Sequence, residues 1–185
     1  MEFHASAIIA AMKRLLLAIA LCMAFTGLVS GQRPQPTFHD ELLDRFQGAW
    51  ALQGTIAGQE TTHDVSTDWV INHQYMRMHE VSREKNSKGE PRYEAIVFTG
   101  WDQATSRYFA IWLDVWGGFS KSTVGYAPRS GDEIRFLFND GKNDFHTTFL
   151  YNRKADTWEW RMDNEENGQL IPYARVKLSR NNSAH

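Results

Sequence analysis

Apolar and polar residues alternate with a period of two along most of the chain from residue 48 onward. Successive side chains of a β-strand point to opposite faces, so this pattern is typical of strands that bury one face. Short segments rich in Gly, Asn, Asp and Pro separate the alternating runs, and this spacing predicts about ten short strands. The clearest alternating runs are Trp50/Leu52/Gly54/Ile56, Val65/Thr67/Trp69/Ile71, Ile134/Phe136/Phe138 and Trp158/Trp160/Met162.

One helical segment is predicted, directly ahead of the strands. Residues 40–46 carry acidic side chains near their start, which favours the N-terminus of a short helix. Sequential short strands in one small domain must close or stack, because a long open sheet leaves two unpaired edges. We therefore expect an all-β fold, an up-and-down antiparallel barrel of about ten strands with a short N-terminal helix. A two-sheet β-sandwich satisfies the same alternation and is the alternative.

The first 31 residues have the pattern of an export signal. The basic pair Lys13-Arg14 precedes the apolar run from Leu15 to Val29, and Met12 is an alternative start. Small residues follow the run, which predicts cleavage after Gly31. Because the run is short for a membrane span, we expect a secreted or periplasmic protein with no stable membrane insertion after cleavage. The remaining chain then divides into a linker (32–39), a single barrel domain (40–180) and a flexible tail (181–185).

Composition removes several classes of function. The only cysteine, Cys22, lies in the predicted signal, so the mature domain would hold neither a disulfide nor a reactive thiolate. The formal net charge is −2 and no run of Lys or Arg occurs, so no nucleic-acid partner is expected. No H-x-H or H-E-x-x-H spacing is present, and we predict no metal site. The oligomeric state stays open.

A G-x-W motif stands at the opening of the first predicted strand. Gly48 permits close approach of neighbouring backbone, and Trp50 is large enough to cover one end of a barrel with its side chain. Arg175 and Arg180, in and beside the last predicted strand, are candidates to stack on the indole ring.

Further tryptophan-centred segments accompany this motif: Trp69-Val70-Ile71-Asn72, Gly100-Trp101-Asp102 with Thr105 and Tyr108, Trp112-Leu113-Asp114, and Gly125-Tyr126. The series resembles an uncharacterised bacterial family of exported lipocalin-like (calycin) domains, related in pattern to the nitrobindin-type ten-stranded barrels, and it extends from Phe46 to Leu178. The resemblance implies a barrel but says little about function, because such barrels host transport, haem binding and catalysis on one frame. Nitrobindin-type barrels bind haem through a histidine near the C-terminus. The last predicted strand, residues 172–178, has no histidine, so haem is disfavoured and no cofactor is expected.

All seven tryptophans follow the predicted signal, and two interpretations of them stay open. They fill the core, or some of them line a cavity for a flat or apolar ligand. In the second case Trp69, Trp112 and Trp160 are the candidates for the wall, with Met78 as a compliant neighbour. The main prediction is non-covalent binding or carriage of a small apolar or aromatic molecule.

Two polar side chains are candidates for the same cavity. Asp114 shares strand parity with Trp112, so it points inward if Trp112 does, although a strand-end aspartate facing water fits equally well. His146 is its candidate partner, and together they would make the alternative, a barrel enzyme in which Asp114 is the general base. Of these two functions, we expect ligand binding ahead of catalysis. Glu80 shares parity with Met78 and ranks below Asp114 as an inward carboxylate.

A third interpretation is a structural or interaction module. In that case the barrel is filled, and Trp101 and Trp116 at loop ends contact a partner protein.

Overall fold

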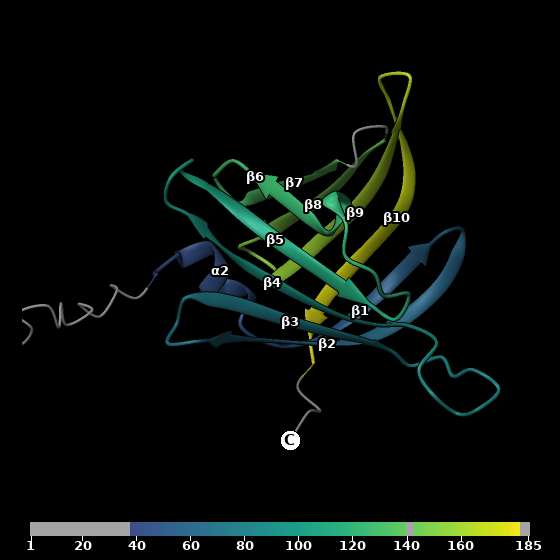
Figure 1. Ribbon diagram of the computed structural model, residues 1–185. Coiled ribbons are helices and arrows are strands. Elements are labelled where there is room, and N and C mark those ends of the chain that lie inside the picture. Colours follow the sequence, from purple (N-terminus) through teal and green to yellow (C-terminus); the bar gives the residue numbers. More distant parts are fainter. Residues whose placement is uncertain (1–37, 140–142, 182–185) are drawn as a thin grey trace, which may run out of the picture. The chain divides into compact units, whose positions relative to one another are not determined.

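The computed structural model describes residues 38–139 and 143–181 and shows a closed ten-stranded antiparallel barrel (Figure 1). Each strand pairs with its neighbours in sequence, and β1 pairs with β10 to close the barrel. The predicted barrel is confirmed, and the sandwich alternative is wrong. The predicted signal, residues 1–31, lies outside the described residues, as do most of the predicted linker and tail. The strands are β1 (Gly48–Ile56), β2 (Gln59–Val70), β3 (Tyr75–Ser82), β4 (Glu94–Asp102), β5 (Arg107–Asp114), β6 (Val124–Ala127), β7 (Glu133–Asn139), β8 (Asp144–Asn152), β9 (Thr157–Glu166) and β10 (Gln169–Arg180).

In the part of the chain that the structure describes, two helical segments accompany the strands. Helix α2 (Glu41–Phe46) precedes β1, and the 3₁₀ turn η2 (Lys121–Thr123) precedes β6. Asp40 caps α2, because its Oδ1 accepts hydrogen bonds from the backbone N–H groups of Leu42 and Leu43 at 3.0 Å each. The cap fixes where the helix starts, and Leu42, Leu43 and Phe46 are buried. Among the described residues, no helix is long and apolar enough to cross a membrane.

The period-two pattern marks the inner face of the barrel along most strands. In β7, Ile134, Phe136 and Phe138 are buried while their neighbours are more exposed, as the alternation predicts. The pattern fails at Ile71, which the sequence places on the inner face of its strand. The strand ends at Val70, and Ile71 lies in the following turn with a φ of 50° and 69% of its surface exposed.

The G-x-W motif joins the first strand, the last strand and the helix. Trp50 is fully buried, and its Nε1 donates to the carbonyl oxygen of Phe46 at 2.7 Å. The guanidinium carbon of Arg180 lies 3.7 Å from the centre of a Trp50 ring. Of the two candidate arginines, Arg180 therefore makes the expected contact. Gly48 is required because its φ is +125° and an added Cβ would come within 2.8 Å of Arg180 Nη1.

Candidate functional site

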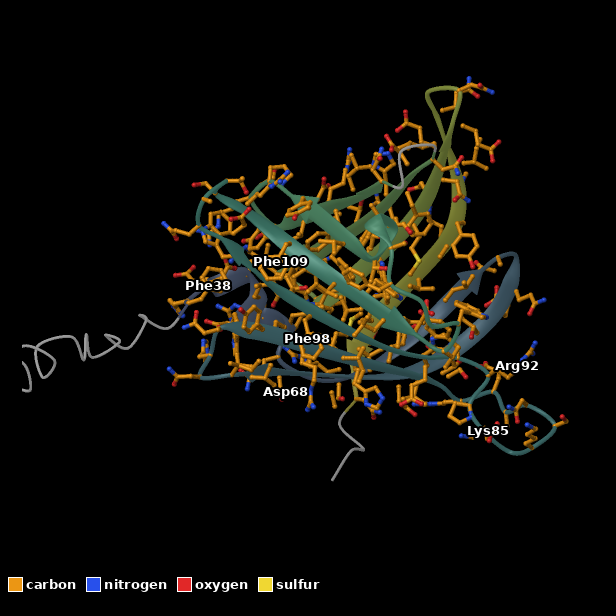
Figure 2. All side chains as sticks on the ribbon, viewed as in Figure 1. Phe38, Asp68, Lys85, Arg92, Phe98 and Phe109 are labelled. Carbon is orange, nitrogen blue, oxygen red and sulfur yellow. The ribbon has the colours of Figure 1, made fainter. Side chains whose placement is uncertain are left out.

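The barrel has a filled end and an open end. We call the end under α2 the closed end; there Phe46 packs against Trp50 and Trp158, and the remaining void is only about 20 Å³. At the other end lies a cavity of about 470 Å³, which we call the mouth cavity. Among the residues labelled in Figure 2, Phe38 lies near α2, and Arg92 lines the mouth cavity.

Aromatic side chains form much of the mouth cavity's wall. They come from strands and loops that lie far apart in the sequence: Tyr93, Trp112, Trp116, Phe145 and Tyr173. Trp112 Nε1 donates to Tyr93 Oη at 3.1 Å, and the Tyr93 ring lies 5.2 Å from the Trp116 ring. Burial raises the pKa of Tyr93 far above its usual value, so this side chain stays a neutral phenol that can donate its O–H.

A second hollow, also about 470 Å³, adjoins the loop from Gly117 to Thr123. Trp112, Asp114, Trp116 and Phe145 line both hollows. The Trp116 ring, which is 74% exposed, therefore lies where the two hollows meet.

A buried carboxylate and histidine form the floor of the mouth cavity. Glu80 on β3 is 1% exposed, His63 on β2 is 4% exposed, and His63 Nδ1 lies 2.5 Å from Glu80 Oε1. The pairing register of β2 with β3 sets Glu80 opposite Val65, one inward position from His63, so the two side chains meet diagonally. Burial raises the pKa of Glu80, and the hydrogen bond with His63 opposes that rise only in part.

The second oxygen of Glu80 has no hydrogen-bond partner among the described residues. Three other buried side-chain atoms share this condition, on Thr147, Trp158 and Trp160, but only Glu80 is titratable and lines the mouth cavity. An unpaired buried acceptor is costly, so Oε2 is a contact point that a ligand or a water molecule would satisfy.

A line of hydrogen bonds leads from this pair to the rim. His63 Nε2 lies 2.8 Å from Thr61 Oγ1, and that hydroxyl donates to Glu84 Oε2 at 3.3 Å. Partial burial raises the pKa of Glu84, but hydrogen bonds from its own backbone N–H, from the backbone N–H of Thr62 and from the Thr61 hydroxyl bring this pKa below its usual value. Glu84 therefore carries a negative charge at the rim.

The structure brings two of the predicted site residues to the mouth cavity. Trp112 and Asp114 both line it, as their shared parity indicates. Asp114 is half-buried at the end of β5, and its Oδ1 accepts from the backbone N–H of Trp116 at 3.0 Å. It therefore has features of both interpretations, an inward carboxylate and a strand-end aspartate.

Three other candidates lie deeper in the barrel or at its closed end. Trp160 is fully buried, with its ring 5.6 Å from Trp112, so it supports the cavity wall from behind. Met78 borders the small void of the filled interior. Trp69 lies at the closed end, where its Nε1 donates to Asp44 Oδ1 of α2 at 2.8 Å.

His146 lies on the outer face of the barrel, away from Asp114. Its neighbour Phe145 lines the mouth cavity, so strand alternation turns His146 outward, where its Nε2 lies 2.8 Å from Glu165 Oε2. The catalytic pairing of Asp114 with His146 is therefore not present. Sequence reasoning ranked Glu80 too low and did not consider His63; the available signal was their parity with Met78 and Val65 on strands adjacent in sequence.

One cluster on the outer face has the donor types of a metal site. Asp144, His146 and Glu165 are partly buried and place one ligand atom each within 4.8 Å of one another. An imidazole and two carboxylates suit zinc or another divalent cation. The sequence predicts no metal site because these residues lie on two strands and no local motif links them.

Comparison with models of known families and with curated proteins finds no match for this chain.

Proposed function

We propose that this chain is an exported, lipocalin-like protein that binds a small apolar or aromatic molecule non-covalently in the mouth cavity. The observation that carries the proposal is the contrast inside one barrel, filled under α2 and hollow at the other end, where the hollow is about 470 Å³. Cavities of this size with aromatic walls and a few polar groups suit small organic ligands.

The wall residues support binding rather than simple packing. Trp112 is held by two fixed contacts, the hydrogen bond to Tyr93 and the ring contact with Trp160, so its inner face is pre-positioned. Pre-positioned aromatic surfaces lose little conformational entropy when a ligand binds. The export part of the proposal rests on the signal-like segment, residues 1–31.

Native mass spectrometry of the protein purified from its own host tests the proposal. We expect a small molecule that leaves when the protein is denatured, and tryptophan fluorescence that shifts with a panel of apolar and aromatic probes. Trp112→Ala should abolish the shift, whereas Trp69→Phe, at the closed end, should leave it intact. A chain with no bound mass and no response to any probe would contradict the proposal and favour an interaction module.

The interaction module receives limited support. Trp116 is exposed, but Trp101 packs at the closed end, stacked on Phe38 at 6.1 Å and within 5.2 Å of the Arg129 guanidinium carbon. The two tryptophans thus do not form one surface. The hollow at the mouth also departs from the filled barrel that this interpretation requires.

Catalysis is the second candidate function. The residues that favour it differ from the pair expected from the sequence, Asp114 and His146. Thr61, His63 and Glu80 are connected in the order hydroxyl, imidazole, carboxylate, the order of acyl-transfer triads, and they would act as one when the Thr61 hydroxyl turns its proton from Glu84 to His63 Nε2. We propose His63, rather than Asp114, as the general base of this alternative. Hydrolysis of short-chain nitrophenyl esters tests it: turnover that Thr61→Val removes and Ser122→Ala leaves unchanged would support it, and no turnover would reject it.

A further inference from the structure

The charged groups of the mouth cavity are mostly acidic. Its lining contains the carboxyl groups of Glu60, Glu80, Glu84 and Asp114, against a single guanidinium, that of Arg92. Arg92 is exposed at the rim, whereas Glu80 is buried at the floor. A ligand that enters therefore moves from a mixed rim toward a buried acid, and an ammonium group placed beside that acid favours its ionised form, so a cation is favoured over an anion.

Glu80 provides a specific position for a positive donor. Its Oε1 is taken by His63, while Oε2 is buried and has no hydrogen-bond partner among the described residues, and the Glu80 residue lines the cavity. The side chain is held in place by the His63 contact, so Oε2 has a defined position. A charged hydrogen bond at such a site is stronger than a neutral one because little water screens it.

Aromatic faces surround this acceptor. Tyr93 stacks on His63 with ring centres 5.7 Å apart, and Trp112 and Trp116 line the same hollow. Aromatic rings attract organic cations through their negative faces. Carboxylate and aromatic rings together form the combination that recognises a small amine, while the rings alone would suit any flat apolar molecule.

We propose that the ligand is a small organic amine that places its ammonium group on Glu80 Oε2 and its carbon frame against Trp112 and Trp116. This inference rests on the proposed binding function and adds the chemical class of the ligand. Tyr93 and Asp114 are among the other polar residues lining the cavity and can contact the ammonium or a second polar group of the ligand.

A matched ligand series tests the charge requirement. Isothermal titration with tryptamine, tryptophol and indole-3-propionate keeps the ring constant and changes the end group from cation to neutral alcohol to anion. We expect tryptamine to bind about tenfold or more tighter than tryptophol, and indole-3-propionate to bind most weakly. Phenethylamine and 2-phenylethanol repeat the comparison with a smaller ring.

A matched pair of variants tests the position. Glu80→Gln keeps the shape and an acceptor for His63 but removes the charge, so tryptamine affinity should fall about tenfold or more while tryptophol affinity stays unchanged. Glu165→Gln removes a carboxylate from the outer face and should change neither affinity. If Glu80→Gln does not fold, the ligand series on the natural chain still decides the question.

The outcomes separate this inference from the function on which it rests. Equal affinity for amine and alcohol, or amine binding that survives Glu80→Gln, overturns the amine proposal and leaves small-molecule binding standing. Binding of a neutral probe without binding of any amine would also overturn the amine proposal and leave small-molecule binding standing. Failure of all ligands and all probes overturns both.

Discussion

The closed end and the mouth of this barrel use the same residue types for different purposes. Under α2, the indole N–H groups of Trp50 and Trp69 bond to the helix, to Phe46 O and Asp44 Oδ1. At the mouth, the indole of Trp112 bonds to a tyrosine hydroxyl beside a hollow, and the Trp116 ring faces solvent. The difference teaches that tryptophan count alone does not identify a binding site; what each ring packs against does.

Buried carboxylates show the same contrast. Asp40, at the closed end, accepts from two backbone N–H groups and from Tyr108 Oη, and it pairs with Arg129. Glu80, at the mouth, has one partner, His63, and one empty acceptor. A carboxylate with all its hydrogen bonds made stabilises the fold, whereas one with an unpaired oxygen is a candidate for reaction or recognition, as we propose for Glu80.

The largest expected effect is the loss of stability caused by a substitution at the closed end. Trp50→Ala removes a fully buried indole, and the free energy of unfolding should fall by about 3–5 kcal/mol. Trp116→Ala removes a mostly exposed ring at the mouth and should change the free energy of unfolding by less than about 0.5 kcal/mol. Urea denaturation of both variants measures the difference, and similar losses would contradict the division into a packed and an open end.

Asp40→Ala sharpens the contrast between the two carboxylates. The variant removes the cap of α2 and the acceptor for Tyr108, so we expect a loss of about 2 kcal/mol in unfolding free energy. Asp132 pairs with Arg153 on the surface, and Asp132→Ala should leave unfolding almost unchanged. Chemical denaturation compares the two. An Asp40→Ala variant as stable as the natural chain would show that α2 does not need its cap.

The pH dependence of stability should reveal Glu80. Because burial raises its pKa, the folded chain binds this proton at pH values where the unfolded chain releases it. The contribution is therefore fully present below the ordinary glutamate pKa of the unfolded chain. It is lost as pH rises through the higher folded pKa.

Glu80→Gln carries no titrating group at this position, so its stability should decline less than that of the natural chain as pH rises above the ordinary glutamate pKa. Thermal denaturation over a pH series that starts below this pKa measures the difference between the two chains. Parallel curves would show that Glu80 titrates at its usual pKa.

The smallest expected effect concerns the contact that joins the first and last strands. Arg180→Lys keeps the charge but loses hydrogen bonds to the carbonyl oxygens of Gln47 and Arg45, together with the planar contact on Trp50. We expect a loss of about 1 kcal/mol. Arg77→Lys, in a surface pair with Asp68, is the control and should have little effect. Equal losses of stability in the two variants would contradict the structural role that we assign to the contact between Arg180 and Trp50.

Much of the fold could be predicted because strand alternation is a local signal. Each inward face of β7 or β9 is readable from a few adjacent residues, and ten such segments leave closure as the way to avoid open edges. The sequence left two candidates near the C-terminus for the arginine that stacks on Trp50. The structure shows that Arg180 makes this contact. Arg180 is paired with Trp50 in the register of β1 with β10, and this pairing brings its guanidinium to the ring.

The site was predicted only where one strand carries it. Trp112 and Asp114 are two residues apart, so parity alone places them together. His63 and Glu80 are 17 residues apart, and their contact depends on the register of β2 against β3. The inward assignment of His146 failed because a histidine fits either face of a strand, and only the packing of Phe145 shows which face is inside.

The sequence by itself determined the class of fold, the helix before the first strand and the tryptophan motif at the closed end. These follow from short-range periodicity, capping and turn chemistry, which neighbouring residues specify. Tertiary structure alone decided which end is hollow, which carboxylate is buried and which acceptor is left unpaired. Those properties depend on strand register and on how side chains from distant strands fill a shared volume, and no short segment of the chain contains that information.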